Sequence, residues 1–216
     1  MIAAARYYLT LMSRRQTALA PLLVFVAVLG MVYASDAGPP LAAGAVPAAA
    51  LVPIGAWLMW LCATCESRAF ADVTLVAVGS GGRRLCARVL AVLAIGAALT
   101  TTACVWARVA NPHPYPVPVV VEIAAVNLAA AVAGLGLGAM FAPPLRATAG
   151  AATLAIAAVV VLSLIVPWLP PLGPLLHAYI GVRPPSGAHA AVAIGQAALF
   201  GALLVAVAYL RGRRAG

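Results

Sequence analysis

Six long apolar segments, separated by short stretches that carry charge, make up most of this chain. The segments without Asp, Glu, Lys or Arg that are long enough to cross ~30 Å of hydrocarbon as a helix run over residues 16–35, 37–65, 89–107, 123–145, 147–182 and 184–210. Their Ala, Val and Leu runs lack the two-residue alternation of a membrane barrel, so helices are expected. Because four prolines interrupt the fifth segment after residue 166, only its first half is predicted to span.

The pattern therefore predicts an all-α integral membrane protein that forms a single transmembrane domain, 1–216. The six transmembrane helices are expected at about 17–35, 44–64, 87–107, 119–142, 148–166 and 190–210. No internal repeat is visible.

Two further segments are apolar without being long enough to span. Residues 1–15, MIAAARYYLTLMSRR, suit a short interfacial helix with aromatics at headgroup depth, although a disordered basic tail fits as well. The stretch LLHAYIGV, 175–182, lies between prolines and predicts a re-entrant segment before the sixth span.

Composition agrees with a membrane protein and adds an orientation. The 216 residues are 65% hydrophobic and only 8% charged, with a mean hydropathy of +1.09. With the N-terminus inside, two arginines fall outside, Arg108 and Arg183, and eleven fall inside: Arg6, Arg14, Arg15, Arg68, Arg83, Arg84, Arg88, Arg146, Arg211, Arg213 and Arg214. The positive-inside rule thus places both termini in the cytoplasm and the chain in the cell membrane, and the net charge of +9 needs no nucleic acid to explain it.

The longest predicted cytoplasmic connection follows the second span and carries ESRAFADVTLVAV, 66–78. On a helix, Ala69, Phe70, Val73, Val76 and Ala77 share one face, while charged and polar residues take most of the other. Arg68 and Asp72 are one turn apart and can pair weakly. The segment is predicted to be an amphipathic helix at the membrane surface, which VGSGG then ends.

This layout resembles the permease subunits of ABC transporters of the type-two export class. Glu66 resembles the family's acidic residue at the end of span two, Leu75 its apolar residue before the turn, and Arg88 its basic residue near the start of span three. VGSGG stands where the family usually has a proline turn. The resemblance implies a cytoplasmic coupling helix that docks on an ATPase, with the coupling residues Glu66, Arg68, Phe70, Asp72, Val73, Leu75, Arg83, Arg84 and Arg88.

The resemblance also implies an assembly of two permease chains, identical or related, with two copies of a cytoplasmic ABC ATPase subunit. GSGGRR lacks the spacing and the lysine of a phosphate-binding loop. The chain is therefore expected to be no enzyme and to hold no cofactor, with ATP and Mg on the partner subunit. Few charges within the spans favour a hydrophobic or amphiphilic substrate, such as a drug, lipid or peptide.

Polar residues inside the predicted spans are candidates for a translocation path or for contacts between helices. They are Thr101 in span three, with its neighbours Thr100 and Thr102, Glu122 and Asn127 in span four, and Gln196 in span six. For each, an interhelical hydrogen bond is the favoured interpretation.

Two alternatives remain open at this point. His113, His177 and His189 fall on the predicted outer side with Asp36 and Glu122, which would suit a protein that handles haem or metal at its outer face, although no pair has local ligand spacing. Cys62 and Cys65 form a C-x-x-C, for which zinc or redox chemistry is the weaker interpretation. A non-transporting membrane scaffold is the other alternative.

Overall fold

The computed structural model describes residues 1–66, 68–142, 149–180 and 187–214, without side-chain detail for 68, 69, 71, 72, 149 and 212–214. The elements are α1 (Ile2–Ser13), the 3-10 turn η1 (Gln16–Ala18), α2 (Leu19–Val32), α3 (Pro40–Thr64), α4 (Arg68–Val78), α5 (Gly81–Ala110), α6 (Val117–Phe141), α7 (Ala149–Ile165), α8 (Gly173–Tyr179) and α9 (Gly187–Arg214). No strand occurs among the described residues. The all-α prediction is therefore confirmed for them.

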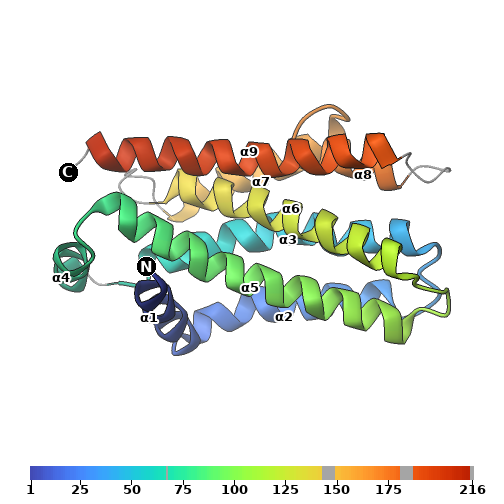
Figure 1. Cartoon of the computed structure of the whole chain (residues 1–216), viewed down its shortest axis with the longest axis horizontal. Helices are drawn as coiled ribbons and strands as arrows, with labels where there is room; N and C mark the ends of the chain where they lie inside the picture. The colour runs from blue at the N-terminus through green and yellow to red at the C-terminus, as the bar shows by residue number, and fades with distance from the viewer. Residues whose placement is uncertain (67, 143–148, 181–186, 215–216) are drawn as a thin grey trace.

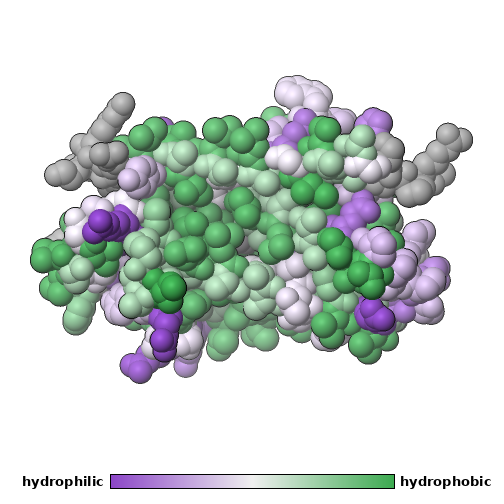
Figure 2. All heavy atoms as spheres, in the orientation of Figure 1, coloured by the Kyte–Doolittle hydropathy of each residue, from purple (hydrophilic) through white to green (hydrophobic). Residues whose placement is uncertain are grey.

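The long helices run side by side along one axis, and the short helices lie toward the ends of this bundle (Figure 1). Helices α1 and α4 lie toward the end that also holds the last turns of α9, and α8 lies toward the other (Figure 1). Apolar side chains cover the middle of the visible face, whereas hydrophilic ones gather toward the two ends (Figure 2). This banding is typical of a protein whose middle lies in hydrocarbon.

Among the described residues, four helices are long and apolar enough to cross a membrane: α3, α5, α6 and α9. A fifth crossing is possible if α1 and the segment Gln16–Val32, which meet at 93°, count as one broken span. Helix α7 is apolar but shorter, and its 17 residues extend roughly 26 Å. The chain thus has the character of a multi-pass membrane protein, with four or five helices that meet the length criterion.

The structure decides between the two alternatives for the N-terminal segment and moves the start of α5. Residues 2–13 form a helix and not a tail, and α5 starts at Gly81, six residues before the expected start of span three. The Ser80 side chain caps α5 by accepting the Arg83 backbone N–H at 3.2 Å, which satisfies one of the free donors at a helix start. Gly79, with φ of 84°, ends α4 just before it.

Helix α6 lies at the centre of the packing, between α3 and α9, and glycines allow the close approach. A Cβ atom at Gly134 would meet the Val52 carbonyl of α3, and one at Gly136 would meet the Gly201 backbone of α9. Small residues that bring helix backbones together are a common device in membrane proteins, where water does not drive helices together. The glycine spacing in α6 therefore serves two neighbours from two sides.

Candidate functional site

Three segments that are far apart in the sequence meet at Glu66, just after α3. Its carboxylate oxygen Oε2 accepts a hydrogen bond from Arg88 Nη2 of α5 at 2.7 Å and another from the Tyr8 hydroxyl of α1 at 3.1 Å. The Arg88 guanidinium also lies over the Tyr8 ring, 5.2 Å from its centroid, within the range of a cation–π contact. The cluster Tyr8–Glu66–Arg88 thus joins α1 to the end of α3 and the start of α5.

The cluster is almost fully removed from solvent. The side chains of Arg88 and Glu66 are 8% and 1% exposed, and Tyr8 is buried. Burial raises the pKa of the Tyr8 hydroxyl above its ordinary value, so the phenol keeps its proton and acts as a donor to Glu66. Removing one partner of such a buried ion pair leaves an uncompensated charge, which makes the pair a strong constraint on where its helices lie.

A second arginine bonds near the same site. It belongs to the bend between α1 and α2, residues 14–18, which is called the elbow below. Arg15 Nη2 donates to the Cys65 carbonyl at 2.5 Å, the residue next to Glu66. The Cys65 thiol in turn lies 3.0 Å from the Cys62 carbonyl. Both cysteines are free and buried, so they pack and bond locally at the end of α3.

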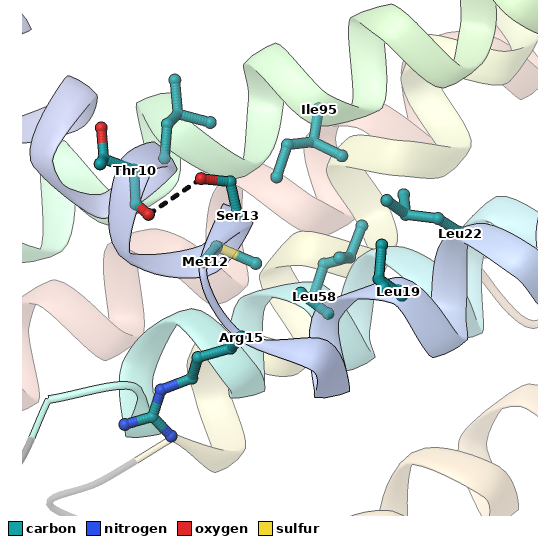
Figure 3. Close-up of a pocket in the computed structure, with 10 residues that line it drawn as sticks. Thr10, Met12, Ser13, Arg15, Leu19, Leu22, Leu58 and Ile95 are labelled. Carbon is teal, nitrogen blue, oxygen red and sulfur yellow. Dashed lines mark hydrogen bonds between the residues drawn. The ribbon is translucent and has the colours of Figure 1, made fainter.

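The inner side of the elbow is hollow. An open pocket of about 480 Å³ lies between the end of α1, the start of α2 and the side chains of Leu58 and Ile95, which belong to α3 and α5 (Figure 3). Arg15 also lines the pocket, with its guanidinium directed away from the other lining side chains, and the Ser13 hydroxyl donates to the Thr10 carbonyl at 2.9 Å (Figure 3). Helix α1 is therefore held to the bundle chiefly through its buried residues and Arg15, with free space beneath the elbow.

Helix α4 offers an apolar surface that nothing in the described chain covers. Phe70 and Val73 are each 66% exposed and Val76 is 83% exposed. The Thr74 hydroxyl donates to the Phe70 carbonyl of its own helix at 2.9 Å. Exposed large apolar side chains clustered on one short helix are typical of an interaction surface.

The residues that the sequence singled out for coupling fall into two groups. Glu66 and Arg88 are buried and bonded to each other, so they cannot form a contact surface. Phe70, Val73 and Arg83 are exposed, while Leu75 and Arg84 are half-buried. The side chains of Arg68 and Asp72, and the expected pairing between them, lie outside the described residues, as do Arg146 and Arg183.

The candidate path residues do not converge on one cavity. Thr101 and Gln196 are exposed, and the Thr101 hydroxyl donates back to the Ala97 carbonyl at 2.9 Å. Asn127 is fully buried and donates to the Ile123 carbonyl of its own helix at 2.8 Å. Glu122 accepts a hydrogen bond of 2.9 Å from Tyr179, which fastens α8 to α6.

The histidines lie in three separate parts of the chain: the connection between α5 and α6, helix α8 and helix α9. His113 Nδ1 lies 2.9 Å from Asn111 Oδ1 and 3.4 Å from Asp36 Oδ1, while His177 lies on α8 and His189 on α9. Among the residues that the structure describes, no group of three or more His, Cys, Asp or Glu side chains could hold a metal ion.

No family model, curated protein or solved structure matches this chain. The interpretation of the site therefore depends on its own geometry. Its most informative feature is the buried pair of Glu66, which precedes the exposed amphipathic helix α4, and Arg88, which lies in the helix that follows α4.

The part of the cluster that sequence reasoning missed is Tyr8. A signal for it exists, because the buried residues of α1, which are Ala5, Tyr8 and Met12, recur at helical spacing on one face. That Tyr8 pairs with Glu66, 58 positions along the sequence, depends on how α1 folds back at the elbow, and local spacing does not encode this fold.

Proposed function

We propose that this chain is the transmembrane permease subunit of an ATP-driven exporter in the cell membrane. In this proposal the chain crosses the membrane six times with both ends in the cytoplasm, and α2 and α7 supply the two shorter spans. Two permease chains form the path, and two cytoplasmic ABC ATPase subunits supply the energy. The distribution of arginines and the resemblance of residues 66–88 to the type-two export class support it.

The observation that carries the proposal is the Tyr8–Glu66–Arg88 cluster. Helix α4 begins two residues after Glu66, and Arg88 lies two turns into the helix that follows α4. Because Glu66 and Arg88 are bonded to each other in a buried site, a force on α4 passes directly into the end of α3 and the start of α5. A short surface helix with this attachment is suited to transmit a partner's movement to two spans.

The exposed apolar residues of α4 supply the contact for that partner. Phe70, Val73 and Val76 expose large fractions of their side chains. Burial of such side chains in a pocket on another protein stabilises the complex. The ATPase is proposed to hold α4 by these residues and to move it when ATP binds. Tyr8 extends the movement to α1, and the hollow beneath the elbow gives α1 room to shift.

The path itself is proposed to lie between two copies of the chain. Thr101 and Gln196 are exposed on the outside of one copy, where a second copy could cover them, and the polar residues of one copy do not share a cavity. The predominantly apolar surface suits a hydrophobic or amphiphilic cargo.

Recovery of an ATPase with the purified chain tests the proposal. The full chain is extracted from its native membrane in mild detergent, and bound ATPase activity is measured for the wild type, Val73→Asp and Val109→Asp. Val109, at the far end of α5, is an 83% exposed control valine. Val73→Asp is expected to reduce the bound ATPase activity at least tenfold, whereas Val109→Asp is expected to retain it. The proposal is wrong if the wild type recovers no ATPase, or if both variants retain it equally.

A further inference from the structure

Helices α1 and α4 enclose an open groove of about 700 Å³. Its walls come from Ala3, Ala4 and Tyr7 on one side and from Phe70 and Val73 on the other, and Arg83 of α5 closes one part of its rim. The groove is amphiphilic, because most of its lining side chains are apolar and the Arg83 guanidinium lies at its edge. It is separate from the hollow beneath the elbow, with which it shares no lining residue.

The part of the chain that the structure describes does not fill this groove. Phe70 and Val73 keep two thirds of their surface exposed, and Tyr7 keeps 40%. The guanidinium of Arg83 has no hydrogen-bond or ion-pair partner within the described ranges, since only its backbone N–H is engaged, by Ser80. No carboxylate belongs to the described lining, so among the described side chains the positive charge at the edge of this apolar groove has no counterion.

The position of the groove restricts what can occupy it. Helix α1 meets the segment Gln16–Val32 at 93°, so if that segment crosses the membrane, α1 lies in the plane of its surface. A helix in that plane with an apolar face lies at the boundary between headgroups and acyl chains. The groove beside it is then at headgroup depth, where a molecule with an anionic head and an apolar tail is available in the cytoplasmic leaflet.

We propose that the groove between α1 and α4 is a binding site for an anionic phospholipid, with the headgroup phosphate at Arg83 and an acyl chain against Phe70 and Val73. Charge complementarity favours this occupant over an apolar peptide, which would leave the Arg83 guanidinium unpaired. Val76 is not part of the groove lining and is 83% exposed. Phe70 and Val73 would therefore be shared between the lipid in the groove and the ATPase proposed above, whereas Val76 stays open to the protein.

This site depends on the membrane placement of α1 and not on the ATPase, so the two proposals can fail separately. A lipid in the groove would bridge the interfacial helix and the amphipathic helix. It would thereby make the position of α4 sensitive to the anionic lipid content of the membrane.

Native mass spectrometry of the full chain, stripped of lipid in neutral detergent, tests the site. Phosphatidylglycerol and phosphatidylcholine with identical acyl chains are added to the wild type and to Arg83→Gln, Ala3→Trp and Arg108→Gln. One arginine near an anionic lipid surface is worth about 1 kcal/mol. Arg83→Gln is therefore expected to reduce the preference for phosphatidylglycerol about fivefold. Ala3→Trp, whose indole fills the groove from an exposed position, is expected to weaken binding of both lipids at least as much.

Arg108→Gln is the matched control, because Arg108 is an exposed arginine in the last turn of the same helix, and it should bind as the wild type does. The proposal is overturned if the wild type does not prefer phosphatidylglycerol, or if Arg83→Gln and Arg108→Gln reduce the preference equally. It is also overturned if Ala3→Trp leaves lipid binding unchanged. Loss of bound ATPase from Ala3→Trp with unchanged lipid binding would assign the groove to the protein partner instead.

Discussion

Replacing Glu66 by Gln isolates the charge of the buried pair from its shape. Gln keeps an oxygen that can accept from Arg88 and Tyr8, so the packing is nearly unchanged, but the Arg88 guanidinium then lacks its counterion. The side chains of Arg88 and Glu66 are only 8% and 1% exposed. Water therefore cannot solvate the charge that remains when the other charge is removed. Glu66→Gln is therefore expected to destabilise the folded chain strongly.

The magnitude follows from the burial. Breaking a buried ion pair by removing one charge costs about 3–5 kcal/mol, and about 1 kcal/mol shifts the melting temperature by roughly 2–4 °C in a chain of this size. A decrease of roughly 6 °C or more is expected for Glu66→Gln. The double variant Glu66→Leu with Arg88→Met removes both charges and should melt closer to the wild type than either single variant.

Thermal unfolding of the purified chain, followed by tryptophan fluorescence in detergent or nanodiscs, measures this difference. Asp36→Asn is the control, because the Asp36 carboxylate is 64% exposed and lies 3.4 Å from His113, and an exposed pair of this kind contributes little. If Glu66→Gln melts within a degree of Asp36→Asn, the buried pair does not fix the end of α3 to the start of α5, and the reasoning about α4 is refuted.

The other predictions concern one contact each and use the same unfolding measurement. Tyr8→Phe keeps the ring against the guanidinium but loses the hydrogen bond to Glu66, and should cost about 1.5 kcal/mol; no loss would mean that the hydroxyl does not hold α1. Gly136→Ala places a Cβ against the backbone of α9 and should cost at least about 1 kcal/mol, whereas Gly30→Ala, with nothing within 4 Å, should be neutral or stabilising. Asn127→Leu should leave the melting temperature unchanged or raise it, because the buried Asn127 Oδ1 has no partner and its loss removes an unsatisfied polar atom; a large decrease would reveal a bond to another helix.

The helices could be anticipated because a membrane imposes a simple rule on the sequence. A spanning helix needs about 20 apolar residues, and charged residues interrupt these runs where the chain reaches water. Helix α4 was also predictable, since the exposed Phe70 and Val73 recur at helical spacing. Its end at Gly79, with positive φ, follows from the one residue type that adopts this conformation freely.

The contacts between segments could not be predicted in the same way. The bond between Tyr8 and Glu66 joins residues 58 positions apart, and it exists only because the chain bends at the elbow. Likewise, nothing local to Thr101 shows that its hydroxyl turns back to its own helix, or that Glu122 meets Tyr179 of α8. Side-chain partners across a helix bundle depend on rotation and depth of each helix, and these are set by packing of the whole molecule.

The proposed role of α4 requires that this helix lie at the cytoplasmic surface, where an ATPase could reach it. Single cysteines at Val76 and Val109, in a chain whose four native cysteines are replaced by alanine, can be labelled with a membrane-impermeant maleimide in intact cells and in inverted membrane vesicles. The cysteine at 76 should react only in inverted vesicles, with less labelling when the ATPase is bound, and the cysteine at 109 only in intact cells. Labelling of position 76 in intact cells would place α4 outside and contradict the account.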